Sequence, residues 1–360
     1  MDVELPWGPG TASGVGSLPY TDPMEATRVV LGELPDLPHL PELPTRGPGA
    51  DMVGRSCALL VGLGVDLQPA GWRLTAAPGR DQRRARSTLG QDLDALEELT
   101  QGYTGPLKVQ VAGPWTLAAS VELPRGGRVL GDHGARRDLA QSLAEGLTEH
   151  LADVRRRVPG ASLVLQVDEP SLPAVLSGAI PTPSGFSRYR SVDNPEAEAL
   201  VREVVSAADA QGAIPIVHCC GSEVPFELLV RGGARGLSFD MARVRDADVE
   251  ALAAAVEQGV TLFVGAVPAV PGPEDASTKP SREGPRGPSD LEVTRAVLRF
   301  WRTLGFPEET AARGCVVTPS CGLAGAEPAW TRTVLTLVRK VAAHLDDRPD
   351  SATAPDDERS

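Results

Sequence analysis

Short apolar runs that favour strands alternate with longer helical segments along almost the whole chain. Each run is short and most are bounded by Gly or Pro, as expected of buried strands in a parallel sheet. We predict strands at residues 14–18, 107–112, 163–167, 214–218, 236–239, 262–264 and 316–318, and an eighth near 65–67. Eight strands that alternate with helices would close a barrel, so we predict one α/β domain with the (β/α)8 TIM barrel fold.

The segments between these runs have helical periodicity and recognisable ends. Apolar residues recur every three or four positions from Leu139 to Val154, and three arginines followed by Pro159 and Gly160 predict the end of that helix. We predict further helices that start at Asn194–Pro195, span 291–304 with Ser289 or Asp290 as N-cap, and span 328–345.

The barrel domain is predicted to cover residues 1–345. Residues 35–49, which are rich in Pro, are predicted to form an ordered loop over one mouth of the barrel. Residues 268–289 combine Pro, Gly and charge, and are predicted to form a long irregular loop. The polar residues 346–360 are predicted to be a disordered tail.

Composition excludes several classes of protein. The net charge of −13 argues against nonspecific nucleic-acid binding, which needs a basic surface. No apolar run approaches the ~20 residues that span a bilayer, and the N-terminus does not resemble a signal peptide. We therefore expect a cytoplasmic protein with no membrane partner. The odd number of cysteines, five, does not indicate a disulfide framework and leaves room for a metal site.

Four predicted strands end in unusual residues, at 166–170, 217–221, 237–240 and 317–322. In a barrel these ends share one face, the face that carries the active site. Residues i and i+2 of an extended chain point the same way, so His218 and Cys220 can share an ion while Cys219 points away. With Asp240 and Cys321 from other strands, they predict a tetrahedral Zn²⁺ site. A buried cysteine is often only a small apolar residue, and this alternative stays open.

Together with three further motifs, these residues resemble the catalytic barrel of the cobalamin-independent methionine synthases. The resemblance implies that His218, Cys220, Asp240 and Cys321, the last within Cys-Gly-Leu, are zinc ligands. The further motifs are Gly-Ser-Leu-Pro at 16–19, Gly-Pro-Trp-Thr at 113–116 and Asp-Glu-Pro at 168–170. They follow one another in the family's order from about residue 14 to residue 345.

The resemblance implies a zinc-dependent methyltransferase that converts homocysteine to methionine. Ser17 would contact homocysteine, and Asp168 would bind its ammonium group by a charge-assisted hydrogen bond. Glu169 is either a second binding residue or a satisfied strand-end carboxylate. Trp115 is either a stacking surface for the ring of the methyl donor or a core residue. Asp240 is proposed as the ligand that yields when the substrate thiol binds.

The chain departs from the family pattern at several places. The family has Glu where this chain has Asp240. It has an acid shortly before Asp-Met-Val, whereas residues 47–50 of this chain are Gly-Pro-Gly-Ala. It also has a His after the seventh strand, and residues 264–289 contain none. The family's N-terminal half, which helps bind folate tails, has no counterpart in this sequence. The methyl donor, methyl-folate or a methylated corrinoid protein, therefore stays open, as does the thiol. The alternative is a metal-free or noncatalytic barrel of the uroporphyrinogen decarboxylase-like superfamily.

Overall fold

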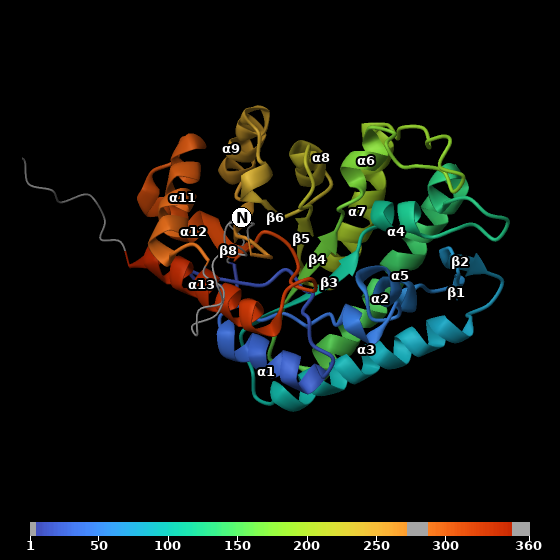
Figure 1. Cartoon of the computed structure of the whole chain (residues 1–360), viewed down its shortest axis with the longest axis horizontal. Coiled ribbons are helices and arrows are strands. Elements are labelled where there is room, and N and C mark those ends of the chain that lie inside the picture. Colours follow the sequence, from blue (N-terminus) through green and yellow to red (C-terminus); the bar gives the residue numbers. More distant parts are fainter. Residues whose placement is uncertain (1–4, 272–286, 348–360) are drawn as a thin grey trace, which may run out of the picture.

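The structure is a computed structural model that describes residues 5–271 and 287–347. Its centre is a six-stranded sheet in which every neighbouring pair is parallel and the spatial order follows the chain. Figure 1 shows these strands side by side, with helices around them. The strands are β3 (Pro106–Ala112), β4 (Ser162–Asp168), β5 (Ile214–His218), β6 (Gly236–Asp240), β7 (Thr261–Val267) and β8 (Cys315–Pro319).

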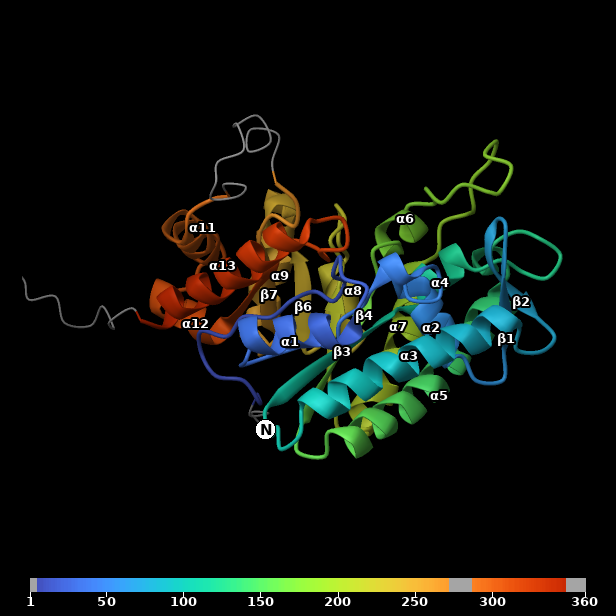
Figure 2. The same cartoon turned by 60° about the horizontal axis from the view of Figure 1, so that its bottom comes forward.

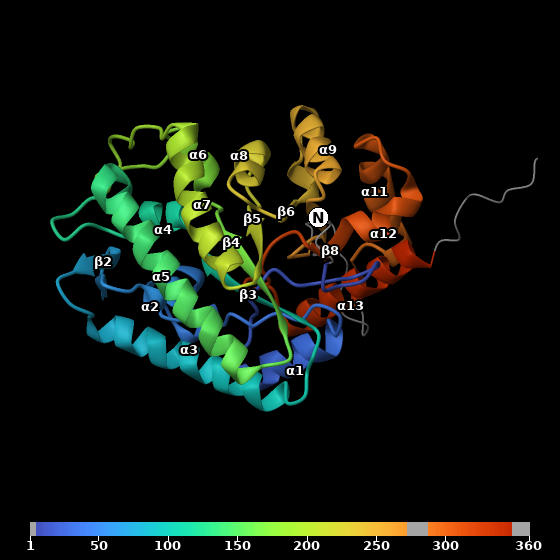
Figure 3. The same ribbon diagram turned by 180° about the vertical axis from the view of Figure 1, so that it is seen from behind.

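Helices connect the strands of this sheet. After β3 come α4 (Pro114–Ser120) and α5 (His133–Arg157); after β4 come α6 (Leu172–Leu176) and α7 (Asn194–Ala210); after β5 comes α8 (Phe226–Arg231). The short helix η3 (Met241–Arg243) and α9 (Val249–Glu257) follow β6, α11 (Asp290–Thr303) and α12 (Ala311–Gly314) follow β7, and α13 (Pro328–Asp346) follows β8. Figure 3 shows α5 and α7 side by side on the outside of the sheet. The alternation of strands and helices predicted from the sequence is confirmed as an α/β fold.

The predicted helices agree closely with the structure. Helix α5 carries the predicted stripe, with Leu143, Leu147 and Leu151 fully buried, and ends at Arg157. Helix α11 has Ser289 as its N-cap in a capping box with Glu292. Helix α7 begins at Asn194, one residue earlier than predicted, so its N-cap is Asp193.

The first part of the chain was predicted less well. Residues 65–67 lie in β1 (Gly64–Gln68), which pairs antiparallel with β2 (Gly71–Thr75) in a separate hairpin, so they are not the eighth barrel strand. Figure 2 shows this hairpin at one end of the molecule, beyond α2 (Met52–Leu59) and α3 (Arg80–Leu99). Apolar and polar residues alternate only weakly in these two strands. The sequence pattern therefore could not show whether residues 65–67 belong to a hairpin or to a parallel strand.

Two extended segments, rather than regular strands, flank the six-stranded sheet. Residues 14–18 were predicted as a strand, but only an isolated bridge from Ser17 to Glu42 forms there. The longer segment 11–17 contacts β8, with Ser13 N donating to Val317 O and Val317 N to Thr11 O, both at 3.0 Å. Residues 38–42, predicted as a loop, contact β3, where Leu40 N donates to Lys108 O at 2.9 Å. The two segments meet through Glu42 N, which donates to Gly16 O at 3.1 Å. Pro38 and Pro41 lack amide donors, so the second segment cannot form a regular ladder and was missed.

The remaining elements at this end are α1 (Pro23–Glu33) and the short helix η1 (Pro44–Arg46). Of the predicted loop 268–289, residues 272–286 lie outside the described residues, as do residues 348–360 of the predicted tail. Asp346 itself is the last residue of α13. Among the helices of the described ranges, none has the length and apolarity needed to cross a membrane.

Candidate metal centre

Three of the four predicted zinc ligands lie together at the carboxyl ends of β5 and β8. One possible ligand atom each of His218, Cys220 and Cys321 lies within 4.8 Å of the others. The Sγ atoms of Cys220 and Cys321 are 3.1 Å apart. Cys219, between the first two, is fully buried in the hydrophobic core. The alternation of side chains along β5 therefore places Cys220 in the cluster and Cys219 away from it.

A hydroxyl group on the neighbouring strand orients the histidine. His218 and Ser238 are register partners on β5 and β6, and His218 Nδ1 lies 2.8 Å from Ser238 Oγ. Metal-binding histidines almost always engage their other ring nitrogen in this way, since the contact fixes the ring. Occupation of Nδ1 leaves Nε2 as the metal-facing nitrogen. Ser238 was not predicted as a site residue; its signal is its position two residues before the strand-end Asp240.

A hydrogen bond links the two thiols of the cluster. The hydrogen bond from Cys220 lowers the pKa of Cys321 to about 4, and His218 adds to that effect. The same hydrogen bond, followed by burial, raises the pKa of Cys220 above its ordinary value. One thiolate is thus present at neutral pH beside an imidazole, and thiolate is the form of cysteine that binds metals. The donor set is the N and S chemistry that zinc prefers.

Asp240 is not part of this cluster. Its carboxylate caps η3 by accepting from Ala242 N at 3.0 Å, and it also accepts from Arg243 Nε at 3.2 Å. It lies at the end of β6, in register with Gly265. The carboxylate would have to leave Arg243 to join the three other predicted ligands.

A pair of buried carboxylates lies next to the cluster. Asp168 ends β4 and is the register partner of His218. Glu42, on the extended segment before η1, interacts electrostatically with Asp168. Burial raises the pKa of both groups, although nearby Lys108 favours their ionised forms. Glu42 Oε1 makes no hydrogen bond to any residue in the described part of the chain.

Glu42 is a site residue that the sequence did not reveal. We looked for an acid immediately before Asp51 and found Gly-Pro-Gly-Ala at residues 47–50. The structure instead brings a carboxylate from further upstream close to Asp168, that of Glu42 between Pro41 and Pro44. A Glu among prolines and leucines was the available signal, because an acid is rarely buried unless it has a partner, and here Glu42 Oε1 lies 3.9 Å from Arg55 Nε.

Ser17 lies beside the loop that carries Cys321. It forms a parallel bridge with Glu42, and its carbonyl accepts from Leu323 N at 2.8 Å. A Cβ added to Gly322 would come within 2.1 Å of Ser17 Oγ, so the glycine leaves room for this hydroxyl in its present position. The first extended segment, Glu42 and the Cys-Gly-Leu motif therefore meet at one place.

Glu169 and Trp115 have structural contacts of their own. Glu169 is fully buried and accepts from Trp115 N at 2.9 Å, Thr116 N at 2.8 Å and Thr116 Oγ1 at 2.7 Å, at the start of α4. Burial raises its pKa to about 7. The Trp115 ring is also fully buried, and its Nε1 donates to Ala197 O at 2.9 Å. These contacts correspond to the structural alternatives considered for both residues.

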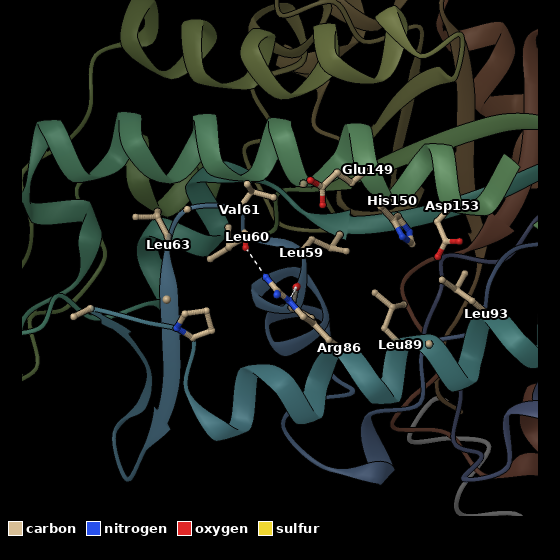
Figure 4. A pocket seen from close by; sticks show the side chains of 17 residues that line it. Leu59, Leu60, Val61, Leu63, Arg86, Leu89, Leu93, Glu149, His150 and Asp153 are labelled. Carbon is tan, nitrogen blue, oxygen red and sulfur yellow. Dashed lines mark hydrogen bonds between the residues drawn. The ribbon is translucent and has the colours of Figure 1, made fainter. Parts of the chain in front are cut away.

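A large cavity lies elsewhere on the molecule. Its volume is about 630 Å³, and it lies between α3, α5 and the segment after α2. Figure 4 shows Leu89 and Leu93 of α3 facing His150 and Asp153 of α5 across it. None of the predicted site residues lines this cavity.

The chain is similar to known proteins in both sequence and fold. The family model described as cobalamin-independent synthase, catalytic domain, matches residues 9–344. A B12-independent methionine synthase from Shewanella sp. W3-18-1, solved in complex with selenomethionine, is 14% identical with a TM-score of 0.61 and covers 94% of this chain and 98% of its own.

Other similarities are weaker. A GH5_18 protein from Streptomyces cattleya, solved in complex with GlcNAc, is 13% identical with a TM-score of 0.43. The match covers 93% of this chain and 80% of that protein, and its TM-score is too low to support an inference. No curated protein matches the sequence. The family match spans nearly the whole chain, and this chain belongs to the cobalamin-independent synthase family, as one of its catalytic domains.

Proposed function

We propose that this protein is a zinc-dependent S-methyltransferase that transfers a methyl group to a thiol, with homocysteine as substrate and methionine as product. The observation that carries the proposal is the cluster of His218, Cys220 and Cys321 beside the carboxylates of Asp168 and Glu42. The family match supports methyl transfer to homocysteine as the reaction class.

The residues of the cluster fit a zinc ion. They provide one imidazole and two sulfurs within 4.8 Å, with the imidazole already oriented by Ser238. We propose Asp240 as the fourth ligand, after its carboxylate leaves Arg243. Zinc, when bound at such a site, supplies a Lewis acid that favours the ionised form of a substrate thiol.

The chain's own residues would bind and orient the amino-acid part of the substrate. Asp168 and Glu42 offer two buried carboxylates to one ammonium group, and an ammonium between them would relieve their mutual repulsion. Ser17 lies next to both Glu42 and the Cys321 loop, where its hydroxyl can bind the substrate carboxylate. Glu169 and Trp115 would act indirectly, by holding the start of α4 beside Asp168.

We also propose that the chain forms a complete barrel and that the protein is cytoplasmic. The two extended segments at residues 11–17 and 38–42 would take the places of the first two strands between β8 and β3, which gives a (β/α)8 barrel over residues 1–345. The five cysteines are free thiols, which suits the reducing cytoplasm. The methyl donor is a methyl-folate or a methylated corrinoid protein.

Two measurements test the proposal. Purified protein should contain about one zinc per chain, as one mixed-ligand site requires, and should form methionine from homocysteine with one of the two donors. A metal-free protein that shows no such activity after zinc is added would instead favour the noncatalytic barrel of the uroporphyrinogen decarboxylase-like superfamily.

A further inference from the structure

A chain of buried hydrogen bonds runs from a lysine to the carboxylate of Asp168. Lys108 is fully buried on β3, and its Nζ donates to Gln166 Oε1 at 2.8 Å. Gln166 Nε2 then donates to Asp168 Oδ1 at 2.7 Å. Both Lys108 Nζ and Gln166 Nε2 also donate to the carbonyl of Val15, at 2.8 and 2.9 Å.

The chemistry of the lysine fixes the direction of this chain. An ammonium group has three donors and no acceptor, whereas an amide has one side that donates and one that accepts. Lys108 can therefore face only the oxygen of Gln166, and the amide nitrogen must face Asp168. Without Lys108 the amide oxygen loses its donor, and only the contacts of Nε2 with Val15 O and Asp168 Oδ1 hold the amide in this orientation.

A purely structural explanation for Lys108 also has to be considered. A buried lysine is costly unless its charge is compensated, and here Asp168 and Glu42 provide opposite charges. The contact with the Val15 carbonyl connects β3 to the first extended segment, so Lys108 could serve only to hold the fold together. A decisive test must therefore measure something that general stability does not change.

We propose that Lys108 is a positioning residue for the amine-binding carboxylate: it sets the orientation of the Gln166 amide, and Gln166 in turn holds Asp168 toward the substrate ammonium. The inference rests on the proposed function, because it assumes that a thiol amino acid binds beside the cluster. It adds a role for two residues that touch neither the metal cluster nor the reacting sulfur.

The test compares two thiols that differ only in the amine. Titration calorimetry of the zinc-loaded full chain would measure binding of L-homocysteine and of γ-mercaptobutyrate, which keeps the thiol and the carboxylate. Lys108→Met has a similar volume and removes the donor. We expect it to weaken homocysteine binding ~10-fold, as for the loss of one hydrogen bond to a charged group, and to leave the amine-free thiol within ~2-fold.

Gln166→Met is the second variant and should show the same selective loss. Thr27→Val, which alters a buried hydroxyl on α1 that has no hydrogen-bond partner among the described residues, is the matched control and should bind both thiols as the wild type does. Circular dichroism and zinc content would check folding. If neither Met variant folds, a crystal structure of the wild type with L-homocysteine decides: Asp168 must contact the ligand nitrogen.

The outcomes separate the inference from the proposed function. The positioning role would be overturned if the Met variants lost binding of both thiols equally, or if their homocysteine binding were unchanged. It would also be overturned if Asp168 did not contact the amine. A wild-type protein that binds neither thiol would overturn the proposed function and the inference with it.

Discussion

The Sγ atoms of Cys220 and Cys321 lie 3.1 Å apart although 101 residues separate them in the sequence. One follows β5 and the other follows β8, so only the folded sheet brings them together. Because a metal between them needs both sulfurs, Cys220→Ala or Cys321→Ala should lose most of the zinc bound by the wild type. Cys219→Ala is the matched control, since Cys219 lies in the core.

Zinc content measured by atomic absorption on the three purified variants checks this prediction. Equal retention of zinc in all three proteins would remove the cysteines from the proposed site.

Ser238 should matter for metal affinity although it is no ligand. Its hydroxyl fixes the ring of His218 at 2.8 Å, and loss of such a partner typically weakens metal binding by ~10-fold or more. We therefore expect Ser238→Ala to release zinc to a competing chelator at a correspondingly lower chelator concentration. Thr318→Val, another buried hydroxyl at the strand ends, is the control. Identical chelator curves for wild type and Ser238→Ala would exclude the orienting role.

Glu169 should make the stability of the protein depend on pH. Burial raises its folded pKa to about 7, above the unfolded value near 4.5. Between these values the folded state holds a proton that the unfolded state has released, so the free energy of unfolding falls as pH rises, by up to ~3 kcal/mol.

Glu169→Gln cannot ionise, so its free energy of unfolding should lack this fall. The free energy of unfolding of the variant minus that of the wild type should therefore increase as the pH rises from about 5 to about 8. Urea denaturation of both proteins at the two pH values measures this change, and other titrating groups cancel in the difference. A difference between the proteins that is the same at both pH values would mean that Glu169 is already ionised in the folded state at the lower pH.

The methyl donor can be tested by direct comparison. A folate amine leaves poorly unless a positioned acid protonates it, whereas a corrinoid leaving group needs no proton. Residues 264–289 contain no His, so we expect methionine formation to be faster with methylcobalamin than with methyltetrahydrofolate or its polyglutamate form. Glu274 and Asp275, which could replace the acid, lie outside the described residues.

The family's cobalamin-independent description favours a folate donor, which makes this a strict test. Faster turnover with either folate would show that the chain has a general acid we have not identified.

The sequence predicted the parts of the fold that have regular periodicity. Strands β3 to β8 and helix α5 could be located because apolar runs and a 3.6-residue repeat report burial directly. The spacing of His218 and Cys220 even predicted which of two adjacent cysteines joins the cluster. The segment at residues 38–42 could not be recognised, because its prolines remove the amides that a regular strand uses.

Long-range contacts of single polar groups could not be predicted from the sequence either. Glu42 reaches the site through an extended segment whose neighbours are distant in sequence, and Ser238 is distinguished only by its register with His218. Each residue has a local signal in the sequence, but neither signal shows which distant residue it contacts. Asp240 was predicted at the end of a strand, where it lies. Its contact with Arg243 was not predicted, because that contact depends on the turn after the strand.

The most direct test of the account is X-ray absorption at the zinc edge, with and without homocysteine. We predict one nitrogen and two sulfur scatterers from His218, Cys220 and Cys321 in the resting protein, with one oxygen from Asp240. Saturating homocysteine should raise the sulfur count by one as the substrate thiol joins the site. An unchanged sulfur count at saturation, or zinc surrounded by oxygen and nitrogen alone, would contradict the proposed thiol-activating centre.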